Sequence, residues 1–172
     1  MTNINYIYWP VDDIFFGEGV KYLTRHLSYP AGLDGFFFIR LDVYSLKDFF
    51  NFYSFSLPQN IIIIYEPNLS VLARYLLFRA QNVKKIFQSD HPLQDIINEL
   101  DSIKNDNKKS KRSSLNHYQY KNFSHKDFEF FRALCINNLE NLDFTSQSNF
   151  YYRKKQLAKK LKVKRVEYLI YN

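Results

Sequence analysis

The alternation of short apolar runs with helical patterns in the first 104 residues is the feature that most constrains the fold. Residues 60–65 read NIIIIY, and four consecutive isoleucines are typical of a strand buried on both faces. The strands are expected at 5–9, 35–41, 60–65 and 82–87, and the helices at 16–28, 45–55, 68–80 and 91–103. Alternation of this kind produces a parallel sheet covered by helices on both faces. Residues 1–104 are therefore predicted to form a small α/β domain of about four βα units.

Residues 122–172 carry only helical patterns. Ser124 is expected to be the N-cap, with Asp127 at the third helical position, and Phe123 and Phe128 have the spacing of a hydrophobic staple. One face of the helix that follows is apolar: Phe128, Phe131, Leu134 and Cys135. Cys135 is therefore interpreted as a core residue. A short helical turn is expected at 139–144, a longer helix at 145–161 and a last short helix at 166–171.

The charge of the chain is uneven along its length. Residues 1–104 hold nine Lys and Arg against eleven Asp and Glu, a net charge of −2, whereas residues 105–172 hold fifteen against six, a net charge of +9. The segment 105–121 is polar, rich in Ser, Asn and Lys, and without periodicity, so it is predicted to be a linker. Whether it is a solvated tether or adds loose phosphate contacts stays open. The asymmetry suggests a polyanion-binding module joined to a slightly acidic domain.

The most basic stretch, Arg153 to Lys164, still keeps a helical apolar stripe. Its apolar side comprises Phe150, Leu157 and Leu161, and its polar side comprises Tyr151, Lys155 and Lys159, flanked by Ser148, Tyr152, Lys160 and Lys162. Ser and Tyr at the start of such a helix suit base edges, while Lys and Arg further along suit phosphates. The pattern predicts a helix that binds double-stranded DNA, although a solvated basic face is the simpler alternative.

The segment KKLKVKRVEYL at 159–169 resembles the end of the helix-turn-helix of LuxR-type regulators. Leu161, Val163 and Leu169 keep the spacing of that family, and FSHKDFEFFRAL at 123–134 resembles its opening helix. The supporting helix departs from the family pattern, since NNLENLDF stands in its place and is shorter. The resemblance and the charge pattern together predict eight DNA-facing residues: Ser148, Asn149, Tyr151, Tyr152, Arg153, Lys155, Lys159 and Lys160. Residues 122–172 would then form a LuxR-type helix-turn-helix domain.

With that resemblance, residues 1–104 look like a degenerate receiver domain. Asp12 and Asp13 imitate its acid pair, and Asp42 stands where a phosphate-accepting aspartate belongs. Tyr65 and Glu66 occupy the place of the receiver's hydroxyl residue, and no Lys follows the last strand. A phosphoryl site without these two groups cannot neutralise the added charge. The three aspartates are therefore interpreted as ordinary strand-end or capping residues.

A more specific resemblance covers most of the chain. The stretch YWPVDDIFFGEGV at 8–20, followed by SLKDFFNFYSF, ARYLLF and FYYRKKQLAKKLKV, is similar to the TviA-like family of Vi-capsule regulators. That resemblance implies an unphosphorylated auxiliary regulator of surface-polysaccharide, virulence or motility genes, and whether it activates or represses a given promoter stays open. Its implied partners are double-stranded DNA, RNA polymerase and an Rcs-type response regulator bound as a heterodimer. A homodimer is the open alternative.

Other function classes find little support in the sequence. One cysteine permits no intrachain disulfide, four scattered His predict no zinc site, and no Gly-rich phosphate loop or hydrolase motif occurs. The protein is thus expected to be neither an enzyme nor dependent on a cofactor. With no signal peptide and no run of roughly 18 apolar residues, it is expected in the cytoplasm and away from membranes. A protein-interaction adaptor with little DNA contact remains the alternative function.

Overall fold

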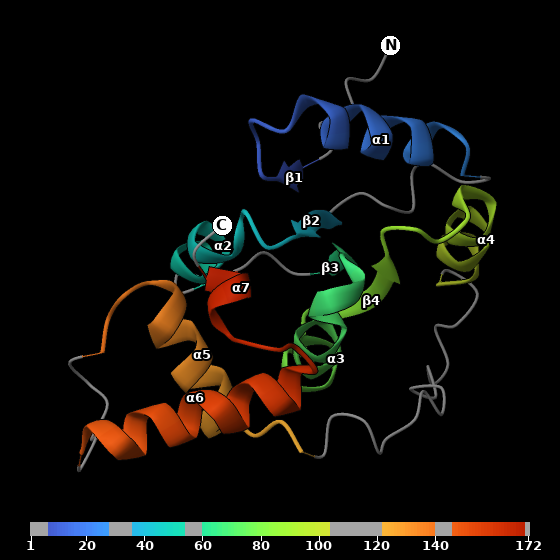
Figure 1. Cartoon of the computed structure of the whole chain (residues 1–172). Helices are drawn as coiled ribbons and strands as arrows, with labels where there is room; N and C mark the ends of the chain where they lie inside the picture. The colour runs from blue at the N-terminus through green and yellow to red at the C-terminus, as the bar shows by residue number, and fades with distance from the viewer. Residues whose placement is uncertain (1–6, 28–35, 54–59, 104–121, 140–145, 171–172) are drawn as a thin grey trace.

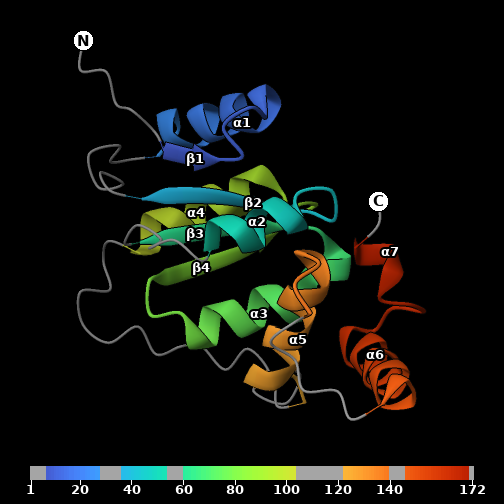
Figure 2. The ribbon, with the colours of Figure 1, turned by 90° about the vertical axis from the view of Figure 1, so that its left-hand side faces the viewer.

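The sheet of this protein contains four parallel strands. In the computed structural model, which describes residues 7–27, 36–53, 60–103, 122–139 and 146–170, these are β1 (Ile7–Trp9), β2 (Phe37–Leu41), β3 (Ile61–Tyr65) and β4 (Val83–Gln88). They lie in the order β1-β2-β3-β4 (Figure 2). Ile63 pairs with Ile39 on one side and with Ile86 on the other. The α/β class and the four predicted strands are confirmed.

Four helices connect and follow the strands, close to the predicted ranges. They are α1 (Ile14–Arg25), α2 (Leu46–Tyr53), α3 (Ser70–Arg79), entered through the 3-10 turn η2 (Pro67–Leu69), and α4 (Leu93–Ile103). Helix α1 begins earlier than predicted because the Asp13 side chain caps it, with Oδ1 accepting a hydrogen bond of 2.9 Å from the Phe16 amide.

The two faces of the sheet are covered by different helices, with α1 and α4 on one side and α2 and α3 on the other (Figure 1). Side chains alternate along each strand, so Ile39 and Ile63 join the core beneath α2 and α3, whereas Phe38 and Ile62 join the core beneath α1 and α4. The strands β1, β2 and β3 are parallel and lie in chain order, and α1 and α2 cover opposite faces of the sheet. The β1-α1-β2 and β2-α2-β3 crossovers therefore have opposite hands. A receiver-type sheet places β1 inside, in the order 2-1-3-4-5. The resemblance to a receiver therefore extends to the class and the layers, and it does not extend to the strand order.

The C-terminal helices are α5 (His125–Cys135), α6 (Gln147–Leu161) and α7 (Glu167–Ile170). The N-cap predicted at Ser124 is confirmed. It forms a capping box with Asp127, since Ser124 Oγ accepts from the Asp127 amide and the Asp127 carboxylate accepts from the Ser124 amide. Cys135 is buried as expected, and burial raises the pKa of its thiol. The linker at 105–121 and most of the turn expected at 139–144 lie outside the described residues.

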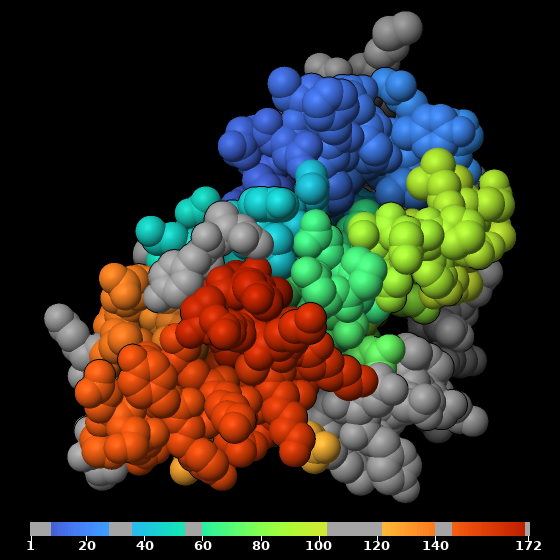
Figure 3. Space-filling view, in the orientation of Figure 1, coloured from blue at the N-terminus to red at the C-terminus, as the bar shows by residue number. Residues whose placement is uncertain are grey.

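Helix α5 packs directly on α2 and α3, so the C-terminal helices and the sheet share one hydrophobic core. The ring of Phe128 lies 5.6 Å from Phe50, 5.8 Å from Tyr53 and 4.8 Å from Tyr75, measured between centroids. In the space-filling view the two parts form a continuous surface (Figure 3). The division into 1–104 and 122–172 stays a prediction about the organisation of the chain, and the two parts are packed together by aromatic side chains.

Candidate nucleic-acid interface

Helix α6 is defined by signals at both of its ends. The Ser146 side chain accepts a hydrogen bond of 3.2 Å from the Asn149 amide at the start. At the end, Lys162 adopts the left-handed conformation, with φ 59° and ψ 35°, and its amide bonds to the carbonyls of Ala158 and Lys159. The helix therefore runs through most of the basic stretch, as predicted, and ends at Leu161, three residues before Lys164.

One side of α6 is built into the core. Leu157 and Leu161 are buried, and Phe150 packs its ring edge-on against Phe130 of α5 at a centroid distance of 6.0 Å. The apolar stripe predicted from spacing is confirmed. Burial on this side turns the opposite side of the helix toward solvent.

Two lysines of α6 are held by carboxylates on the neighbouring helices. Lys160 Nζ lies 2.9 and 2.7 Å from the two carboxylate oxygens of Asp127 in α5, and Lys154 pairs with Glu167 in α7. Burial acts to raise the pKa of Asp127, but hydrogen bonds from Lys160 and Ser124 prevail and lower it. Lys160, predicted to face DNA, is therefore placed against α5 with its charge already paired.

The remaining predicted residues divide between the outward face and its flanks. Tyr151 and Tyr152 are exposed by 60% and 62%, and Ser148, Lys155 and Lys159 are exposed beside them. Asn149 and Arg153 are half-buried, and the Arg153 guanidinium lies 4.7 Å from the centre of the Phe130 ring. Five of the eight predicted residues thus share one exposed face, which we call the α6 face.

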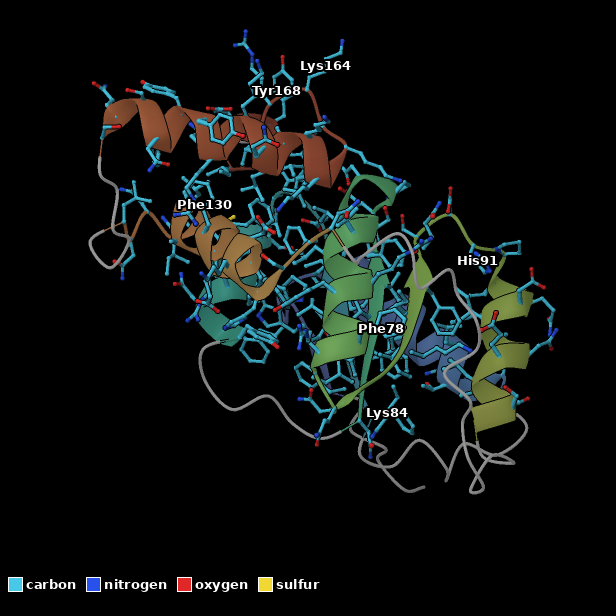
Figure 4. The ribbon with its side chains drawn as sticks, turned by 90° about the horizontal axis from the view of Figure 1, so that it is seen from below. Phe78, Lys84, His91, Phe130, Lys164 and Tyr168 are labelled. Carbon is cyan, nitrogen blue, oxygen red and sulfur yellow. The ribbon has the colours of Figure 1, made fainter. Side chains whose placement is uncertain are left out.

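The turn after α6 extends this face with residues outside the eight that were predicted to face DNA, although Lys162 had been placed at the flank of the polar side. Lys162, Lys164 and Arg165 are exposed, and Tyr168 of α7 is exposed by 55%. Figure 4 shows Lys164 and Tyr168 on the outer side of α6, with Phe130 on its inner side. The cations that continue past Lys160, at Lys162, Lys164 and Arg165, were the signal that could have found this extension.

The three aspartates of the receiver-like region are held by local partners. Asp13 caps α1 and pairs with Arg40, while the buried Asp42 lies 2.8 Å from Arg40 Nε and accepts a hydrogen bond from the Ser45 amide. Asp12 is exposed. The interpretation of Asp13 and Asp42 as cap and strand-end residues is confirmed. Arg40, which was not selected from the sequence, supplies a fixed positive charge between these two carboxylates.

The sequence model of the EcpR N-terminal domain matches residues 1–104, which include the whole sheet and its four helices. The chain belongs to the EcpR N-terminal domain family. This EcpR-family chain is also 28% identical over 169 residues to the Vi polysaccharide biosynthesis protein TviA of Salmonella typhi, covering 95% of the chain and 93% of TviA. The resemblance to TviA-like proteins is confirmed, and no solved structure matches the chain.

Two general properties of the EcpR-family chain bear on its chemistry. Among the described residues, no three His, Cys, Asp or Glu side chains gather closely enough to hold a metal ion. The helices formed by those residues are each too short or too polar to cross a membrane.

Proposed function

We propose that this EcpR-family protein is a DNA-binding transcriptional regulator that lays the α6 face in the major groove of double-stranded DNA. The observation that carries the proposal is the separation of the two sides of α6. Its leucines are buried, whereas Tyr151, Lys155 and Lys159 face solvent together. A disordered basic tail or an evenly charged surface helix would not require this separation.

The chemistry of the α6 face matches the two parts of a DNA ligand. Ser148, Tyr151 and Tyr152 stand in the first two turns, where a recognition helix contacts base edges. Lys155, Lys159 and the exposed cations of the following turn suit phosphates. Each phosphate that they neutralise releases a counterion, which drives binding and makes it sensitive to salt.

The α6 face is already exposed while α5 is packed on the sheet. DNA binding in this proposal therefore requires no release of one part from the other. The acid cluster around Asp42 already contains the Arg40 guanidinium, which fits a regulator that works without phosphorylation. The similarity to TviA supports target genes of surface polysaccharide synthesis. RNA polymerase and either an Rcs-type response regulator or a second copy of the chain are the proposed protein partners.

A protein-interaction adaptor is the second candidate, and one observation favours it. Lys154 and Lys160 bind carboxylates within the molecule, so part of the charge of α6 is unavailable to DNA. Chromatin immunoprecipitation of the tagged protein, with and without its partner regulator, separates the two functions. Promoter signals that vanish when the partner is absent support the adaptor.

Titration against duplex DNA at several salt concentrations tests the proposal directly. Lys155→Ala and Lys159→Ala should each weaken binding and lower the salt slope by about one unit, since each removes one phosphate contact. Lys84→Ala is the matched control, because Lys84 is exposed on the side of the molecule away from α6 (Figure 4). Unchanged salt slopes in both α6 variants would exclude α6 as the DNA contact.

A further inference from the structure

A crevice of about 470 Å³ lies between α1 and α4, at the carboxyl end of the sheet. Its apolar walls include Phe15, Phe16 and Leu23 from α1 and Leu93 and Ile96 from α4. Polar side chains that follow the strand ends line its other side. We call this space the α1/α4 crevice.

The position of the crevice is where an open parallel sheet generally binds ligands. Glu66 directly follows β3 and Ser89 directly follows β4, so both line the crevice from the carboxyl ends of their strands. Ligand sites in such sheets lie outside these ends, where the connections turn to opposite faces. Here the connection through α1 lies on one face and those through α2 and α3 lie on the other. The volume also falls in the range of small-molecule sites, roughly 300–1,000 Å³.

The mouth of the crevice leaves large apolar side chains in contact with water. Phe15 is 92% exposed and Leu93 is 43% exposed. Covering such surface with an apolar group is favourable in proportion to the area removed from water. The ligand is therefore expected to have an apolar body.

The charges around the crevice favour a cation over an anion. Arg40 lines it, but its guanidinium pairs with Asp13 and Asp42, so these three groups together carry one negative charge. The Glu66 carboxylate adds a second negative charge and accepts a long hydrogen bond of 3.4 Å from the Val43 amide. His91 also lines the crevice, and the start of α4 contributes about half a positive charge. Even with a full positive charge on His91, these groups would not offset the two negative charges.

We infer that the α1/α4 crevice binds a small amphipathic cation, with its ammonium group at Glu66 and its apolar body against Phe15, Phe16 and Leu93. Arylalkylamines are the simplest members of this chemical class. The crevice and α6 lie at opposite ends of the molecule (Figure 1), so the site is separate from the proposed DNA contact. An occupant of the crevice would leave the α6 face free.

The site is tested by titrating the full ¹⁵N-labelled chain with three probes and following its amide chemical shifts. The probes are 2-phenylethylamine, 2-phenylethanol and 3-phenylpropionate, which share a ring and differ in the charge of the head group. Saturable shifts should be confined to residues that line the crevice. The amine should bind about fivefold more tightly than the alcohol, the size of a partly exposed ion pair, and the carboxylate should bind most weakly.

Three variants separate the charge from the apolar contact. Glu66→Gln removes the charge but keeps an oxygen that can accept a hydrogen bond from the Val43 amide. The affinity for 2-phenylethylamine should therefore fall to that for 2-phenylethanol. Phe15→Ala should weaken both probes by about threefold or more, because it removes an aromatic wall. Ile14→Ala is the control, since Ile14 is 71% exposed on the same turn and does not line the crevice. Ile14→Ala should leave the affinity for both probes unchanged.

Each alternative result overturns the inference. If 3-phenylpropionate binds most tightly of the three probes, the charges around the crevice favour anions. If Glu66→Gln still prefers 2-phenylethylamine, Glu66 is not the counter-ion of the ammonium group. Shifts from all three probes that are weak, unsaturable or spread over the surface would show that the crevice is not a binding site. The amide spectrum of each variant, recorded without probe, establishes that it remains folded.

Discussion

Replacing Phe128 by Ala should destabilise the sheet as well as the helix that carries the residue. Phe128 belongs to α5, is 3% exposed, and contacts rings from α2 and α3. Truncating a buried Phe costs about 3–5 kcal/mol. In a chain of this size each kcal/mol lowers Tm by about 2–4 °C. The expected fall is therefore about 6–20 °C.

The single tryptophan allows the two parts to be followed separately. Trp9 ends β1 and stacks on Phe52 of α2 at a centroid distance of 5.6 Å, so its fluorescence reports on the sheet. Far-UV circular dichroism reports on all helices, including α5 and α6. Because α5 shares its core with α2 and α3, both signals should melt together in the wild type and should fall together in Phe128→Ala.

Tyr152→Ala provides the control, because Tyr152 is an exposed aromatic residue of α6, which packs beside α5. Its effect on stability should stay within about 0.5 kcal/mol. A tryptophan transition that keeps its wild-type temperature in Phe128→Ala, while the helical signal is lost earlier, would refute the shared core. The C-terminal helices would then unfold as an independent unit.

Three further predictions concern Leu157, Asp127 and Asp42. Leu157→Ala should lower the free energy of unfolding by about 2–5 kcal/mol in chemical denaturation and reduce DNA binding with it; native stability would contradict the buried position of this residue. The lowered pKa of Asp127 stabilises the fold above the usual aspartate pKa of about 3.9, and this contribution is lost as the pH falls through the folded value. Urea unfolding at pH 7 and pH 3 should therefore differ less in Asp127→Asn than in the wild type, and an equal difference would show that the Lys160 contact does not matter. Acetyl phosphate should leave Asp42 unmodified in mass spectrometry, because Arg40 and the Ser45 amide already bind its carboxylate; a stable phosphoaspartate there would contradict this.

Local patterns in the sequence were enough to predict the helices and strands and the apolar and polar sides of α6. The isoleucine run of β3, the capping box at Ser124 and the spacing of Leu157 and Leu161 each act over a few residues. Such features depend on side-chain period and on hydrogen bonds within one turn, so neighbouring residues specify them. The TviA-like stretch around Trp9 was readable for the same reason, as one continuous motif.

Only the tertiary structure decided which elements pack together and which charged side chains form ion pairs within the molecule. The place of β1 at the sheet edge and the packing of α5 on α2 arise from contacts between distant segments, which leave no periodic trace in the sequence. Lys155 and Lys160 look alike in the basic run. Lys160 nevertheless lies against Asp127, 33 residues earlier in the chain, while Lys155 faces solvent. The two lysines point about 140° apart around the helix, since five residues separate them. Only the packing of α5 against α6 brings the Asp127 carboxylate to the side of Lys160.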